Sequence, residues 1–172
     1  MTRGPQLYRI GQPFDGRLAV SRMPRGFEEL EDEVAGWRDA GIDMVVSMLE
    51  VEDAEDVGLA REGELCRAYG IEFVNCSVQD HGIPGDHRPV VDAVERAIAL
   101  LGKGKQIAAH CFAGIGRSPL FVACCLVHHG LEVDLAWARI NAARGLRLPD
   151  TEAQRRWVAD FAQQRRAGRE RR

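Results

Sequence analysis

The chain has 172 residues, a formal net charge of −3, 45% hydrophobic residues and 28% charged residues. This composition is typical of a folded globular protein and excludes collagen-like, coiled-coil and wholly disordered chains. The near balance of acids and bases gives no overall field that would draw the protein onto nucleic acid or an anionic membrane. No uncharged run approaches the length of a membrane-spanning helix, and the amino terminus carries no signal-peptide pattern, so we expect a cytoplasmic protein.

Apolar periodicity and glycine punctuation predict the elements of the amino-terminal half. After a leader rich in glycine and proline, a strand is predicted at 18–20, a helix over 28–40 and a buried strand over 42–49. An acidic stretch, 50–56, is expected to be solvated and to lead into a helix that ends near Gly70.

The second half continues the alternation of strands and helices. A strand is predicted at 71–76, a helix from about 89 to 101, a strand at 106–110, and then helices over 117–129, 134–144 and 151–166. This order predicts an α/β fold with a central, mostly parallel, twisted sheet flanked by helices. Because no repeat or linker divides the chain, we predict a single domain over 1–172 with a frayed basic tail at 165–172.

The segment between the strand 106–110 and the helix 117–129 is the most informative part of the chain. Cys111 follows the strand, Arg117 opens the helix, and the residues between them are Phe112, Ala113, Gly114, Ile115 and Gly116. Glycines let successive backbone N–H groups turn toward an anion, and the amino terminus of the helix adds positive potential. Arg117 offers a bidentate fork for two phosphate oxygens. The pattern predicts a phosphate-binding loop.

The same arrangement activates the sulfur of Cys111. Helix ends and nearby cations favour the thiolate form of a cysteine, which is the nucleophilic form. We therefore predict that Cys111 is a nucleophile and that the Ser118 hydroxyl stabilises its sulfur when the sulfur departs as a leaving group. His110 is expected to orient the loop rather than to transfer protons.

A thiolate cannot protonate a departing oxygen, so the reaction needs a general acid on a nearby loop. Asp80 is the candidate, because it follows the strand 71–76 in a loop punctuated by glycine and proline. The alternative is an ordinary turn aspartate. Asp86 suits the cap of the next helix. His81 and His87 are expected to be surface polar residues, with contact to substrate as the alternative.

The arrangement His110-Cys111-x5-Arg117-Ser118, preceded by Asp80, resembles the cysteine-dependent protein tyrosine phosphatase superfamily, in particular its small dual-specificity branch. The order and spacing of residues from about 18 to 161 are similar to the kinase-associated phosphatases of that branch. The resemblance implies a phosphocysteine intermediate at Cys111, Asp80 acting as acid and then as base, and neither metal nor cofactor. It also implies a phosphorylated protein as the partner.

Two departures from that family bear on substrate and mechanism. Many members have a Gln-Thr pair before the last helix to position the hydrolytic water, whereas this chain has Pro149-Asp150-Thr151, with Gln154 as the nearest amide. Thr151-x-x-Gln154 also has the pattern of a capping box, a purely structural role. The absence of a tyrosine-bearing pocket segment suggests a cleft shallow enough for phosphoserine and phosphothreonine. The lack of a cation at 112–116 favours phosphoprotein over phosphoinositide.

Two other classes of protein remain as alternatives. One is a catalytically inactive scaffold that binds phosphorylated partners, and the other is a thiol redox or arsenate-type enzyme, which needs a resolving cysteine. The five cysteines are irregularly spaced, and Cys66, Cys76 or Cys124 could trap an oxidised Cys111. Cys124 and His128 share a helix face, but packing in an apolar helix explains them better than metal binding.

Overall fold

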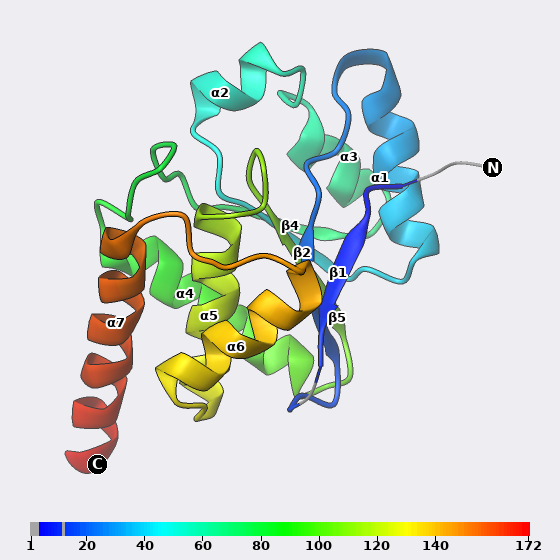
Figure 1. The fold of residues 1–172 in the computed structure, drawn as a ribbon. Helices are drawn as coiled ribbons and strands as arrows, with labels where there is room; N and C mark the ends of the chain where they lie inside the picture. Colours follow the sequence, from blue (N-terminus) through cyan, green and yellow to red (C-terminus); the bar gives the residue numbers. More distant parts are fainter. Residues whose placement is uncertain (1–3, 12) are drawn as a thin grey trace.

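A five-stranded sheet lies between two layers of helices in the computed structural model, which describes residues 4–11 and 13–172 (Figure 1). The strands are β1 (Leu7–Ile10), β2 (Arg17–Ser21), β3 (Met44–Ser47), β4 (Glu72–Asn75) and β5 (Gln106–His110). Their order is β1-β2-β5-β3-β4, with β1 antiparallel to β2 and every other pair parallel. The predicted α/β class with a mostly parallel sheet is confirmed. Of the predicted domain 1–172, residues 1–3 and 12 lie outside the described residues.

Helices cover both faces of this sheet. They are α1 (Leu30–Asp39), preceded by the short 3-10 helix η1 (Phe27–Glu29), α2 (Val51–Asp56), α3 (Glu62–Ala68), α4 (His87–Leu101), α5 (Arg117–His129), α6 (Val133–Arg144) and α7 (Glu152–Glu170). Figure 1 shows α1 and α3 on one side and α4 to α7 on the other, with α5 packed against β2 and β5. Within the described ranges, no helix combines the length and the apolarity that a membrane crossing requires.

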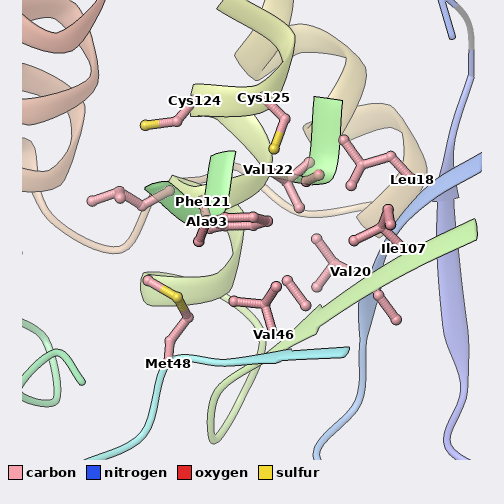
Figure 2. Packing of buried hydrophobic residues seen from close by; sticks show 14 of the residues in the cluster. Leu18, Val20, Val46, Met48, Ala93, Ile107, Phe121, Val122, Cys124 and Cys125 are labelled. Atoms are coloured by element: carbon pink, nitrogen blue, oxygen red, sulfur yellow. The ribbon is translucent and has the colours of Figure 1, made fainter. Parts of the chain in front are cut away.

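The core is apolar on both sides of the central strands. Every residue of β3 is buried, as are the last four of β5, because parallel strands covered by helices on both faces expose neither face to water. Figure 2 shows strand residues such as Val20 and Ile107 facing Phe121 on α5. The three tryptophans belong to this core, with 0%, 1% and 5% of the residue exposed at 37, 137 and 157. Burial of such large side chains supplies much of the hydrophobic free energy of folding.

The register of the strands decides where the loops meet. Ser47 pairs with His110 and with Asn75 of β4, so β3, β4 and β5 end at one edge of the sheet. Ligands of open parallel sheets bind at this carboxyl edge, where the loops after the strands converge. The loop that contains Cys111 and the loop that contains Asp80 both start there, which brings together segments about thirty residues apart in the sequence.

Two elements of the amino-terminal half differ from the prediction. The predicted leader contains β1, a short, partly exposed edge strand that is stabilised by pairing with β2, a partner its own sequence does not reveal. The acidic stretch is itself the helix α2, and a break with Gly58 at φ +76° separates it from α3. Glycine adopts this positive φ without a steric penalty, which permits the turn, and the Gly58 carbonyl accepts a hydrogen bond from the N–H of Phe27.

The prediction of a frayed tail over 165–172 is wrong, because α7 continues to Glu170. Its basic side chains have partners on neighbouring elements. Arg165 pairs with Glu95, Arg166 pairs with Glu132, and Arg169 donates to the His128 carbonyl. These contacts hold the last turns of the helix against α4 and α5, a tertiary effect that the polarity of the segment does not indicate.

Candidate active site

The loop 111–116 joins β5 to α5, and three of its carbonyl groups accept hydrogen bonds from residues outside the loop. Arg144 Nε lies 3.1 Å from the Gly114 oxygen and its Nη2 lies 3.2 Å from the Ala113 oxygen, while the N–H of Asp150 donates to Ile115. Because N–H and C=O point in opposite directions across a planar peptide, outward carbonyls leave the following N–H groups directed inward. The loop therefore has the form of an anion cradle. Gly114, at φ +70°, allows the required turn.

Cys111 lies at the base of this loop. Its side chain is buried, with 3% of the residue exposed, and its sulfur lies 3.3 Å from the Oγ of Ser118, which is fully buried in the first turn of α5. The sequence-based prediction that this hydroxyl reaches the sulfur is consistent with the geometry. The helix α5 begins at Arg117 without a side-chain cap, so the positive end of its dipole lies beside the loop.

Arg117 and Asp80 are brought together beside Cys111. The guanidinium of Arg117 is almost completely buried, donates from Nη1 to the Val78 carbonyl at 2.8 Å, and donates from Nη2 to Asp80 Oδ1 at 3.1 Å. Asp53 on α2 lies 3.9 Å from the same guanidinium, and the Phe112 ring stacks over it at 5.0 Å. A buried cation held on several sides has little freedom to rotate, which suits the recognition of a planar array of oxygens.

The contacts of His110 are consistent with the expected role of orienting the loop. Its main partner is Glu62, which the sequence analysis did not identify. Its Nε2 lies 2.6 Å from Oε1 of Glu62 on α3, and both residues are buried. The imidazole also stacks on Trp37, and its Nδ1 lies 3.4 Å from the Cys111 carbonyl. No local pattern distinguishes Glu62 from the exposed acids around it, so only the tertiary structure reveals the pair.

Gln154 forms the predicted capping box, and its side chain also reaches the cavity at Cys111. Thr151 and Gln154 form the capping box at the start of α7, and the Gln154 Nε2 donates to the Gly82 carbonyl at 3.1 Å in the Asp80 loop. Gln154 is buried and lines the cavity above Cys111. The structure therefore confirms the cap and places the amide at the cavity, where positioning of water stays a prediction.

The cavity has a volume of about 150 Å³. It is lined by Asp80, His81, Cys111, Phe112, Ala113, Ile115, Gly116, Arg117, Asp150 and Gln154. Sequence reasoning missed Arg144 as a support of the loop, and it missed the contact between His81 and Asp150 at the mouth of the cavity. Asp86 caps α4 as expected, accepting from the N–H of Arg88, and does not line the cavity.

The remaining cysteines are buried, which disfavours their thiolate forms. All five cysteines are free, and burial raises the pKa of Cys66 to about 12 and that of Cys76 to about 11. Burial also raises the pKa of Cys124 and of Cys125. A resolving cysteine must react as a thiolate, so these raised pKa values disfavour the redox alternative. Among the described residues, no group of three or more His, Cys, Asp or Glu side chains could hold a metal ion.

Known proteins share sequence similarity with this chain. A family model described as Tc-R-P, polymorphic toxin system, DSP-PTPase phosphatase, matches residues 19–131. Protein tyrosine phosphatase domain-containing protein 1 of Danio rerio is 33% identical over 107 residues, or 62% of the chain, and the Mus musculus protein is 28% identical over 121 residues, or 66%. The chain spans only 15% and 16% of the length of these two relatives.

Solved structures show the same fold at low sequence identity. Kinase-associated phosphatase, with its catalytic cysteine substituted by serine, superimposes with a TM-score of 0.86 at 16% identity, covering 97% of this chain and 99% of its own. PTPMT1 superimposes with a TM-score of 0.79 at 19% identity, covering 97% of this chain and 100% of its own.

Proposed function

The chain belongs to the DSP-PTPase phosphatase family, and from this membership and the geometry around Cys111 we propose that it hydrolyses phosphate monoesters on protein Tyr, and on Ser or Thr, through a phosphocysteine intermediate. One observation carries the proposal. The Cys111 sulfur, 3.3 Å from the Ser118 hydroxyl, lies in the same small cavity as the Arg117 guanidinium and its partner Asp80. A nucleophile, an oxyanion-binding cation and a proton donor are the groups that phosphoryl transfer needs.

In the first step, the Cys111 thiolate attacks phosphorus and the bond from phosphorus to the ester oxygen breaks. The guanidinium of Arg117, still anchored at the Val78 carbonyl, exchanges its hydrogen bond to Asp80 for one to a phosphoryl oxygen. Together with the inward N–H groups of the loop it stabilises the charge of the transition state. Asp80, in its protonated form, gives its proton to the departing oxygen. The products are the free alcohol or phenol and a phosphocysteine.

In the second step, water attacks the phosphocysteine and the bond from sulfur to phosphorus breaks. Asp80, now a carboxylate, accepts a proton from the water, and inorganic phosphate is released. The sulfur departs as a thiolate, and the hydroxyl of Ser118 stabilises it by donating a hydrogen bond. The buried amide of Gln154, which lines the cavity, is placed to orient the attacking water.

The size of the cavity supports a macromolecular substrate. At about 150 Å³ it is smaller than the roughly 300–1,000 Å³ of sites that enclose whole small ligands. Such a cavity takes the phosphorylated end of a side chain, and the rest of the substrate lies across the surface. Apart from Arg117 and the imidazole of His81, its lining has no cationic side chain, which favours a monophosphorylated protein over a multiply charged phosphoinositide.

The proposal is tested by the hydrolysis of p-nitrophenyl phosphate, a good leaving group, and phenyl phosphate, a poor one. Cys111→Ser should abolish both activities while inorganic phosphate still binds. Asp80→Asn should slow phenyl phosphate by about 100-fold or more, the usual contribution of a general acid, and p-nitrophenyl phosphate far less. The matched control is Asp160→Asn, an exposed position on α7, which should leave both rates unchanged.

The other outcomes separate the alternatives. Binding of phosphate without turnover by the wild-type chain would identify a scaffold that recognises phosphorylated partners. Thioredoxin-linked reduction without phosphate release would identify a thiol redox enzyme. Equal losses for the two esters in Asp80→Asn would contradict Asp80 as the acid.

We also propose that residues 1–172 fold as one phosphatase domain that acts in the cytoplasm on phosphorylated protein, with neither nucleic acid nor membrane as a partner. The five free cysteines support a reducing compartment, because thiols persist there. Fractionation of the producing cells tests the location, and limited proteolysis tests the domain. A stable fragment that excludes α7 would contradict a single folding unit.

A further inference from the structure

The Asp80 loop ends in a turn whose backbone is strained at His81. The N–H of Gly82 donates to the Gln79 carbonyl at 2.8 Å, so Asp80 and His81 are the two central residues of the turn. His81 has a φ of +57°, in the left-handed region, where a residue with a side chain costs about 1–2 kcal/mol. Such conformations persist where surrounding contacts enforce them, and they cluster at functional sites.

His81 makes the contacts that enforce this conformation. Its N–H donates to Asp80 Oδ1, its Nδ1 contacts Oδ2 of Asp150, and its Nε2 lies 3.6 Å from Oδ2 of Asp80. Asp150 belongs to the segment before α7, where its own N–H donates to the Ile115 carbonyl of the phosphate-binding loop. The imidazole therefore connects the Asp80 turn to the support of the loop that contains Cys111.

Three charged groups face His81, and their balance favours the imidazolium. The hydrogen bond to Asp150 raises the pKa of His81 above its ordinary value, the negative charges of Asp80 and Asp150 raise it further, and the cation of Arg117 opposes them. Because a raised pKa keeps the ring protonated to higher pH, the ion pair with Asp150 is present in acid. It is lost as the pH rises through the pKa of His81 in the folded protein.

We propose that His81, held by Asp150, is a positioning residue that fixes the Asp80 turn over Cys111 in the orientation from which Asp80 protonates the leaving group. This inference rests on the proposed phosphatase function and deepens it. His81 acts through Asp80 and does not transfer protons itself. A second tie, from Gln154 to the Gly82 carbonyl, also holds the turn, so loss of the His81 contact loosens the turn without detaching it.

The test uses His81→Asn and Asp150→Asn. Asparagine tolerates the left-handed conformation, so the first variant removes the imidazole without breaking the turn. Each variant should lower kcat/KM for phenyl phosphate about tenfold and change that for p-nitrophenyl phosphate less than about twofold, because only the poor leaving group depends on a well-placed acid. In an Asp80→Asn background, His81→Asn should cause no further loss. The matched control, His87→Asn, alters an exposed histidine on α4 and should leave both rates unchanged.

A spectroscopic readout accompanies the kinetics. In NMR titrations of the imidazole resonances, the His81 pKa should fall in Asp150→Asn, which verifies the contact in solution, while the selective loss with phenyl phosphate distinguishes positioning from a role limited to folding. Equal losses for the two esters, or a His81 titration unchanged in Asp150→Asn, would overturn the inference while the phosphatase function stands. If the wild-type chain hydrolyses neither ester, the proposed function fails and this inference fails with it.

Discussion

Replacement of Glu62 by alanine should destabilise the protein more than any surface substitution on the same helix. The Glu62 carboxylate is 2.6 Å from the His110 imidazole, with the two residues 2% and 0% exposed. Removing it leaves a buried ring nitrogen unpaired, at about 1–3 kcal/mol, and leaves a cavity that adds to the loss. We therefore expect a decrease of about 3 kcal/mol in the free energy of unfolding, a large part of the total stability of about 5–15 kcal/mol.

Glu62→Gln should cost much less, about 1 kcal/mol, because an amide can still pair with the ring nitrogen. Urea titration followed by tryptophan fluorescence measures both, since the three tryptophans are buried and Trp37 stacks on His110 at 5.8 Å. Activity should fall about tenfold in Glu62→Ala, because the imidazole also contacts the Cys111 carbonyl and small displacements of a nucleophile are costly.

Glu64→Ala provides the control for this prediction. Glu64 is on α3 as well, but its side chain is 66% exposed and pairs with the exposed Arg61 at 3.1 Å. Its loss should change the free energy of unfolding by less than about 0.5 kcal/mol. If Glu62→Ala proved no more destabilising than Glu64→Ala, the argument that a buried carboxylate supports His110 would be refuted.

Three further predictions concern stability and binding. Burial, together with the charge of Arg165, lowers the pKa of His128 to about 4. Because the unfolded chain binds this proton at higher pH than the folded protein, the free energy of unfolding should decline as the pH falls from about 6.5 to about 4. After allowance for solvent screening, the decline should be about 1 kcal/mol. His128→Asn should flatten this decline in urea titrations at about pH 7 and pH 4.5, and an unchanged slope would exclude His128 as its source. Gly114→Ala puts a side chain at φ +70° at a cost of about 1 kcal/mol. We expect the loop to relax without phosphate and to regain this strain on binding, so inhibition by inorganic phosphate should weaken about fivefold, and unchanged inhibition would show that the loop keeps its conformation without phosphate. Thr151→Ala removes the cap shared with Gln154 and should lower Tm by about 2–4 °C in calorimetry, whereas an unchanged Tm would show that the cap contributes nothing.

The helices and strands that the sequence predicted best are those with a strong local sequence pattern. The bounds of β5 and α5 agree with the prediction, because an apolar run followed by glycines and a helix start is a local signal. The placement of Cys111, Ser118 and Arg117 follows from that same segment. By contrast, β1 has a pattern too short to be distinguished from a loop, and α2 is acidic enough to suggest a solvated stretch.

The pairs that complete the candidate site come from distant parts of the chain. Glu62 meets His110 across 48 residues, and His81 meets Asp150 across 69. The sequence by itself determined the α/β class, the cradle and its nucleophile candidate, because hydrophobic periodicity and glycine placement act over a few residues. Only the tertiary structure decided that Glu62 is the acid behind the cradle and that Asp150 is the carboxylate that holds the Asp80 turn. The partner of a side chain depends on the register of the strands and on the packing of the helices. Neither is encoded in the residues next to that side chain in the sequence.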